Sequence, residues 1–131
     1  MLKLFKSLVL VLASLLVTAP AVAAPPAWSQ YDAAQFARAQ AAGKVIVVDV
    51  HATWCPTCRA QEPTLDALRS EPRLRGAIFV KVDFDTQKEF LRQYRIPRQS
   101  TVLVFKGTRE TARSIAETRP AQLRAAVLSG L

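Results

Sequence analysis

The sequence predicts an α/β domain in which a mixed four-stranded sheet has helices on both faces. Helical and strand-like patterns alternate through the first half of the chain, as in a βαβ unit whose parallel strands are joined by a right-handed crossover. Residues 45–50, Val-Ile-Val-Val-Asp-Val, are almost wholly apolar and β-branched, which is typical of a central strand buried on both faces. The last two strand-like segments flank the turn Lys106-Gly107-Thr108, so we expect a C-terminal antiparallel hairpin.

The elements of the first half have recognisable ends. Ser29 is the expected N-cap of a helix that stops at Gly43, because serine caps helix starts and glycine accepts the left-handed conformation that follows a helix. The strand at 45–50 comes next. Helical spacing of leucines predicts a second helix over 55–70, with a kink at Pro63.

The second half continues the alternation. Residues 78–84 alternate in polarity and are rich in β-formers, which predicts a second strand. Thr86 and Glu89 form a capping box that would open a helix ending before Pro97. The remaining expected elements are strands at 101–105 and 111–116 and a helix at 119–128 that is capped by Thr118 and has Pro120 in its first turn.

The N-terminal segment predicts export. Lys3 and Lys6 precede the apolar run 8–17, which is followed by Ala21-Val22-Ala23, the pattern of a cleaved secretory signal peptide. The apolar run is short for a membrane span, which needs about 20 residues. This pattern places the mature protein in the periplasm.

Cleavage is expected after Ala23, so residues 1–23 are the signal peptide and 24–131 a single domain. The signal peptide contains two of the 18 Lys and Arg residues and none of the 10 Asp and Glu residues, which leaves the mature chain with a net charge of +6. The basic residues are scattered and lack an aromatic cluster, so we expect no nucleic-acid partner.

Cys55 and Cys58, the only cysteines of the chain, point to thiol chemistry. A disulfide between them would close a very short loop and add little stability, so their spacing does not favour a structural crosslink. A helix start stabilises a thiolate through its unpaired N–H groups and its dipole, which makes Cys55 the expected nucleophile. Cys58 can then attack a mixed disulfide formed by Cys55.

Further features surround the two cysteines: Asp49 six residues before Cys55, Trp54, the Cys-Pro-Thr-Cys motif, Pro63 five residues after Cys58, and the segment 102–107. With these features the mature chain resembles the thioredoxin family from about Tyr31 to Leu128. The resemblance implies a thioredoxin fold and a thiol-disulfide oxidoreductase that acts on protein disulfides, with Cys55 as nucleophile and Cys58 as resolving thiol.

The resemblance also implies roles for other residues. A buried Asp49 would have a raised pKa and accept the proton of Cys58, although a satisfied buried polar residue is the alternative reading. The residues expected to contact substrate are Trp54, Pro56, Thr57, Ser100 and Thr101.

Ser100 departs from the family pattern, because it stands where thioredoxins have a cis-proline that contacts substrate and keeps metals away from the dithiol. A cis bond before serine would cost about 2.5 to 4 kcal/mol, so we expect a trans bond there. The departure leaves open a metal-binding or copper-handling module in which His51 joins the two thiols as a ligand. For His51, a packing role is the alternative.

The length of the connection between the second and third predicted strands bears on the direction of electron flow. Exported disulfide oxidases of this superfamily have a large helical insertion, whereas here only residues 84–101 separate the second and third strands. The resemblance therefore favours a reductase over an oxidase. We expect a periplasmic monomer without a cofactor, kept reduced by an electron donor in the membrane.

Overall fold

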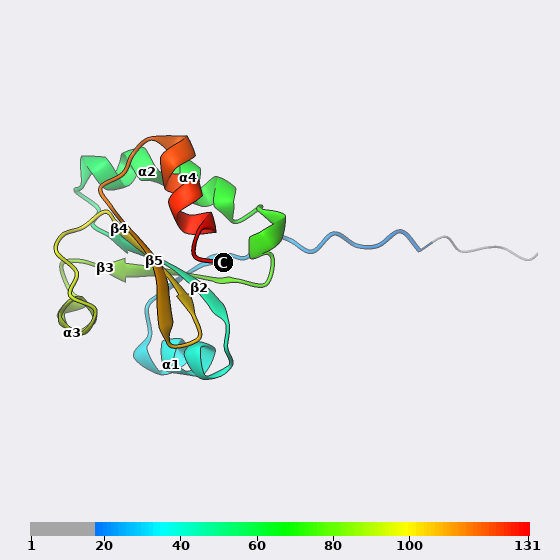
Figure 1. The fold of residues 1–131 in the computed structure, drawn as a ribbon, viewed down its shortest axis with the longest axis horizontal. Helices are drawn as coiled ribbons and strands as arrows, with labels where there is room; N and C mark the ends of the chain where they lie inside the picture. Colours follow the sequence, from blue (N-terminus) through cyan, green and yellow to red (C-terminus); the bar gives the residue numbers. More distant parts are fainter. Residues whose placement is uncertain (1–17) are drawn as a thin grey trace, which may run out of the picture.

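The computed structural model describes residues 18–131. The strands are β1 (Trp28–Gln30), β2 (Val45–His51), β3 (Ile78–Asp83), β4 (Thr101–Lys106) and β5 (Arg109–Ile115). The helices are α1 (Ala33–Ala41), α2 (Pro56–Leu68), α3 (Lys88–Gln93) and α4 (Pro120–Leu128), together with a short 3-10 helix at Pro72–Leu74. Most of the predicted signal peptide falls on residues 1–17, outside the described residues, and the segment from residue 18 runs away from the domain in Figure 1.

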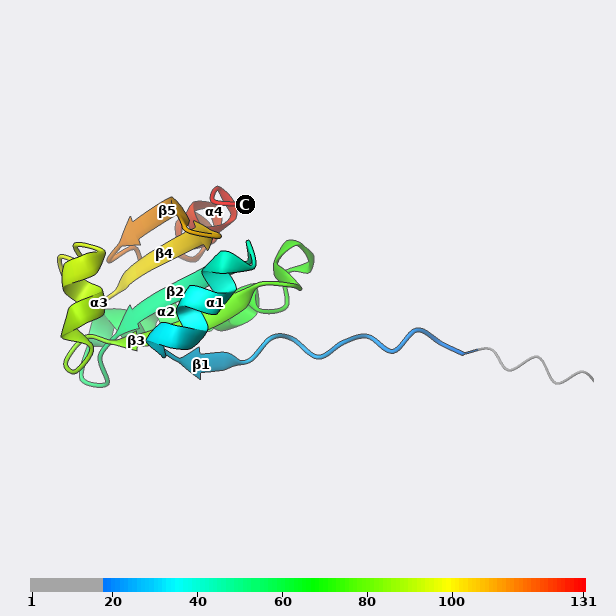
Figure 2. The same cartoon turned by 90° about the horizontal axis from the view of Figure 1, so that it is seen from below.

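Within residues 18–131 the sheet has five strands in the order β1-β3-β2-β4-β5. Helices α2 and α4 cover one face, and α1 and α3 lie on the other (Figures 1 and 2). Strand β2 pairs in parallel with β3 and antiparallel with β4, and β4 and β5 form the C-terminal hairpin. The predicted α/β class, central strand and hairpin are confirmed, and the predicted number of strands was one too low.

The additional strand, β1, explains the error at the first helix. Ser29 was predicted to cap that helix, but it lies in β1, which pairs in parallel with β3. The cap is Asp32, whose Oδ1 accepts the Gln35 N–H at 2.8 Å. A three-residue strand at the sheet edge shows too little alternation to be recognised from its sequence. Gly43 follows α1 with φ at +69°, as predicted for its end.

Two other predicted caps are wrong. Helix α3 begins after Gln87, because Asp83 Oδ1 accepts the N–H groups of Asp85 and Thr86 at 2.7 and 3.2 Å and holds that segment as a turn. Helix α4 begins after Arg119 rather than Thr118, and its first helical residue is Pro120. At this second start, Glu117 Oε1 accepts the Arg119 N–H at 2.8 Å, so in both places a competing local interaction replaces the expected cap.

The core has two layers, one on each side of the sheet. Ile46, Val48 and Val50 of β2 pack toward α1 and α3, where the buried aromatic rings of Phe36 and Phe90 meet edge to face. Alternate residues of β2 face the other side, where the buried residues of α2 and α4 form the second layer. Asp49 belongs to this second side by alternation, so a carboxyl group lies beneath α2.

No helix within residues 18–131 is long and apolar enough to cross a membrane.

Candidate active site

Strand β2 leads into α2 at the left of Figure 1, and the two cysteines lie at the start of α2. Cys55 is the N-cap of α2, and its Sγ accepts the N–H of Cys58 at 3.2 Å. Pro56 is the first helical residue, where its missing N–H costs no hydrogen bond. The predicted placement of the pair at a helix start is therefore confirmed.

Both thiols are free and buried, in contact with Ala52 and Phe84. Burial raises the pKa of Cys55, but hydrogen bonds from Cys58, Ser100 and backbone N–H groups outweigh it, so the pKa lies below its ordinary value. The pKa of Cys58 is raised, first by burial and then by its hydrogen bond to Cys55. This asymmetry makes Cys55 the thiol that ionises first.

Ser100 lies directly against both sulfurs. Its Oγ is 3.2 Å from Cys55 Sγ and 3.1 Å from Cys58 Sγ. The peptide bond before Ser100 is trans, as predicted, and φ of Ser100 is +63°. The residue has 0% exposed surface, and its side chain faces the thiols.

Thr101 is buried as well. Its exposed fraction is 0%, and its Oγ1 donates to the Arg98 carbonyl oxygen at 2.8 Å. The hydroxyl closes the turn before β4, and the substrate contact expected at Thr101 stays a prediction.

Trp54, Pro56 and Thr57 form the accessible rim of the site. The Trp54 side chain is exposed, and its Nε1 donates to Asp85 Oδ2 at 2.8 Å. Pro56 is also exposed, and Thr57 is half-buried. The structure therefore leaves this rim as the accessible part of the predicted substrate surface. Asp85, which orients Trp54, was missed because no local pattern links it to a residue 31 positions earlier.

Asp49 is buried beneath α2 beside a lysine. Its Oδ2 is 4.0 Å from Lys81 Nζ, which is also 3.3 Å from Glu62 Oε1. Within the described chain Asp49 Oδ1 has no hydrogen-bond partner. Burial raises the pKa of Asp49 to about 6, although the Lys81 ammonium acts in the opposite direction. The carboxyl group therefore has the burial and raised pKa that the sequence predicts, and one oxygen able to take a proton.

His51 is half-buried at the end of β2, and its pKa is lowered first by burial and then by Lys81. Throughout residues 18–131, no group of three or more His, Cys, Asp and Glu side chains is arranged to hold a metal ion. The structure thus does not bring His51 together with Cys55 and Cys58 as the alternative metal site requires.

Gln61 is a site residue that the sequence did not reveal. It lies on α2, is completely buried, and its Nε2 donates to the carbonyl oxygens of Ser100 at 3.2 Å and Glu117 at 2.9 Å. A glutamine on an amphipathic helix ordinarily faces solvent, so no local signal distinguishes it. Its amide connects the helix of the cysteines to the loop of Ser100.

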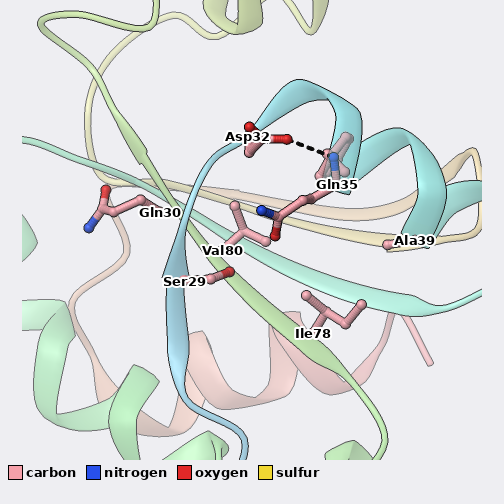
Figure 3. Close-up of a pocket in the computed structure, with 8 residues that line it drawn as sticks. Ser29, Gln30, Asp32, Gln35, Ala39, Ile78 and Val80 are labelled. Carbon is pink, nitrogen blue, oxygen red and sulfur yellow. Dashed lines mark hydrogen bonds between the residues drawn. The ribbon is translucent and has the colours of Figure 1, made fainter.

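A separate cavity of about 90 Å³ lies between α1 and the β1–β3 edge of the sheet (Figure 3). Figure 3 shows the Asp32–Gln35 hydrogen bond at the start of α1 beside it. None of the predicted site residues lines this cavity, so it is not part of the dithiol site.

The sequence profile of the family described as thioredoxin matches residues 28–129. The chain is similar to the solved structure of Trxlp from Edwardsiella tarda EIB202, with 42% identity and a TM-score of 0.72, over 76% of this chain and 96% of that chain. It is also 30% identical over 99 residues to a thioredoxin from Malassezia sympodialis, covering 76% of this chain and 91% of that protein.

A third similarity is to Thioredoxin H2-2 of Oryza sativa subsp. japonica, which is 36% identical over 72 residues, 55% of this chain. The matched stretch spans only about half of the rice protein, 52%.

Proposed function

Because the chain belongs to the thioredoxin family, we propose that it is a thiol-disulfide oxidoreductase that reduces disulfides of protein substrates. The observation that carries this proposal is the asymmetric dithiol. Cys55 caps a helix and has a lowered pKa, and the neighbouring Cys58 has a raised one. Disulfide exchange requires this arrangement, in which the nucleophile ionises more readily than the resolving thiol beside it.

The reaction proceeds in two exchanges. The Cys55 thiolate attacks one sulfur of a substrate disulfide, a mixed disulfide forms, and the other substrate sulfur leaves as a thiolate that takes a proton from water. Cys58 then loses its proton and attacks Cys55 Sγ, so the second substrate thiolate leaves. Two electrons pass from the dithiol to the substrate, and a Cys55–Cys58 disulfide remains.

Asp49 is proposed as the acceptor of the Cys58 proton. Its pKa of about 6 lets the carboxylate form at neutral pH while keeping it basic enough to take a proton. The unpartnered Oδ1 supports this role, because a buried carboxylate oxygen without a partner is free to accept a hydrogen bond, and then a proton, from an approaching donor. Water between the two groups can carry the proton.

The rim of Trp54, Pro56 and Thr57 is proposed to receive the substrate. An exposed indole beside a reactive thiol offers an apolar surface to a peptide chain, and its hydrogen bond to Asp85 holds the ring in one orientation. No cofactor is needed for the two exchanges.

The proposed direction is reduction, supported by the short connection between β3 and β4, whose only helix is the six-residue α3. We expect a reduction potential nearer the thioredoxin value of about −270 mV than the oxidase value of about −120 mV. Equilibration with glutathione buffers and acceleration of insulin reduction by dithiothreitol measure these properties. A potential near about −120 mV would overturn the direction, and a protein that exchanges with neither reagent would overturn the activity.

We propose a periplasmic monomer that receives electrons from a membrane donor. Export is supported by the pattern of residues 1–23, and residues 21–24 are exposed. Expressed with its natural N-terminus in a Gram-negative host, the protein should appear in the periplasmic fraction with Ala24 as its first residue. Intact-mass spectrometry of the fractions measures this, with Ala23→Phe as the control that should block cleavage. Full-length protein confined to the cytoplasm would contradict the proposal.

A further inference from the structure

The hydroxyl group of Ser100 lies within hydrogen-bond distance of both sulfurs in this site. Ser100 Oγ lies 3.2 Å from Cys55 Sγ and 3.1 Å from Cys58 Sγ, so neither contact is preferred by distance. A serine hydroxyl has a single proton and turns freely about its C–O bond. It can therefore donate to either sulfur, but only to one at a time.

The backbone of Ser100 is held firmly enough to keep its oxygen between the sulfurs. Its N–H donates to Val50 O at 2.8 Å, and its carbonyl accepts from Ala116 N at 2.9 Å and from Gln61 Nε2 at 3.2 Å. These bonds keep φ at +63°, a left-handed conformation that residues with a Cβ adopt at a cost. The fold thus maintains a strained residue whose side chain touches both reacting atoms.

We propose that the Ser100 hydroxyl follows the negative charge between the two sulfurs during disulfide exchange, donating first to the Cys55 thiolate and then to the Cys58 thiolate. This inference rests on the proposed exchange activity and adds Ser100 to its catalytic residues. In the reduced protein the acceptor is Cys55, because its pKa is lowered and that of Cys58 is raised, so Cys55 ionises first.

The change of hydrogen-bond acceptor from Cys55 to Cys58 follows from which sulfur is negatively charged at each step. When Cys55 Sγ forms a bond to a substrate sulfur, it becomes a neutral disulfide sulfur and a poor acceptor. The hydroxyl, which keeps its proton, then turns about its C–O bond and can donate to Cys58 Sγ. Cys58 gives its own proton to a base, Asp49 or water, and the hydroxyl stabilises the thiolate that attacks Cys55. No proton leaves Ser100 at any step.

The ionisation of the thiols agrees with this arrangement. The hydrogen bond of Ser100 acts to lower the pKa of Cys55 and that of Cys58, against the opposing effect of burial. Several ionisable side chains on the packed elements are not among the leading causes of either shift: Asp49 and His51 on β2, Arg59 on α2 and Asp83 on β3. Ser100 is therefore the side chain besides the cysteines that sets the balance between thiol and thiolate.

The same hydroxyl biases the redox equilibrium. A thiolate accepts a strong, charge-assisted hydrogen bond, whereas neither sulfur of the Cys55–Cys58 disulfide is charged. Ser100 thus stabilises the reduced protein more than the oxidised one, and makes the protein a weaker reductant than it would be without the hydroxyl.

Two variants that lack the hydroxyl test the proposal. Ser100→Ala retains the Cβ, and Ser100→Gly also relieves the left-handed backbone, so a shared effect belongs to the hydroxyl. Both should raise the Cys55 pKa by about one unit, a tenfold change in the ionisation constant. Both should also shift the equilibrium with glutathione about tenfold toward the disulfide, or about 30 mV to lower potential. Thiolate absorbance at 240 nm and glutathione titration measure the two quantities.

The hydrogen bond from Ser100 to the Cys58 thiolate is tested by a separate measurement. One equivalent of 5,5′-dithiobis(2-nitrobenzoate) releases one thionitrobenzoate when Cys55 reacts and a second when Cys58 resolves the adduct. In both variants the second release should be about tenfold slower at neutral pH, and its pH profile should move about one unit to higher pH, because less Cys58 is ionised.

The outcomes separate the two proposals. Unchanged Cys55 pKa and second-phase profile in both variants would overturn the role of Ser100, as would an effect in Ser100→Ala that is absent in Ser100→Gly. Failure of the wild-type protein to exchange disulfides would instead overturn the proposed function, and the Cys55 pKa would still test the first contact. Circular dichroism and thermal unfolding check that both variants are folded.

Discussion

Cys55→Ser is expected to abolish disulfide reduction, whereas Cys58→Ser retains the first exchange and stops at the second. The sulfur of Cys55 is the one that the α2 N-terminus and three kinds of hydrogen-bond donor stabilise as a thiolate. A serine hydroxyl at the same place stays protonated at neutral pH and is a far weaker nucleophile. Cys58→Ser leaves that thiolate intact but removes the group that releases the substrate.

The two variants are each other's control, since both replace a buried sulfur by oxygen in the same turn. With insulin and dithiothreitol, turnover should fall to the uncatalysed rate in both. Mass spectrometry after addition of a disulfide peptide should show a stable adduct on Cys58→Ser and none on Cys55→Ser. An adduct that forms only on Cys55→Ser would reverse the assigned roles of the two thiols.

Asp49→Asn is expected to stabilise the protein above pH 6 while slowing the resolving step. Folding raises the pKa of Asp49 from 3.8 to about 6, so the folded state favours the protonated carboxyl. This contribution to stability is fully present below pH 3.8 and is lost as the pH rises through about 6. Over that range the loss amounts to about 3 kcal/mol. Asparagine does not ionise and avoids it.

Urea unfolding at several pH values measures this effect. The free energy of unfolding of Asp49→Asn relative to wild type should rise by about 2 to 3 kcal/mol between pH 4 and pH 8. Any destabilisation by the buried Asn amide is independent of pH, so it does not affect the change in this difference between pH 4 and pH 8. Glu62→Gln is the matched control, because Glu62 is exposed and faces the same Lys81. The difference in free energy of unfolding between Glu62→Gln and wild type should therefore change little with pH. A flat difference for Asp49→Asn would contradict a raised pKa.

The same variant tests the proton transfer. With no carboxylate to accept the Cys58 proton, the second release of thionitrobenzoate should slow by about tenfold or more, within the usual range for loss of a general base. The first release should be unaffected. A second phase equal to that of the wild type would refute the role of Asp49 and leave the stability prediction standing.

The features that were predicted correctly depend on residues that are neighbours in the chain. The apolar run of β2, the turn before β5 and the cysteine pair at the start of α2 each show their pattern within a few positions. The missed strand β1, in contrast, exists because β3, which is distant in the sequence, offers it a partner edge. The Thr86 cap is a different case, because Asp83, only three positions away, competes for the Thr86 N–H.

Part of the candidate site could not be predicted from the sequence. Gln61 and Asp85 act on residues 39 and 31 positions away, and nothing in their own surroundings shows it. Thr101 matched the expected substrate surface by position, but it is buried, because its hydroxyl closes the turn before β4.

The sequence alone determined the α/β class, the dithiol, the nucleophile at the helix start and the unusual serine at position 100, since each is a property of residue types at short spacing. Only the tertiary structure decided what Ser100 does. Its hydroxyl meets both sulfurs because the loop before β4 folds back against α2, although Cys55 and Ser100 are 45 positions apart in the sequence. Long-range packing and hydrogen bonds to Val50 and Gln61 create that contact. A contact made by packing has no signature in local sequence.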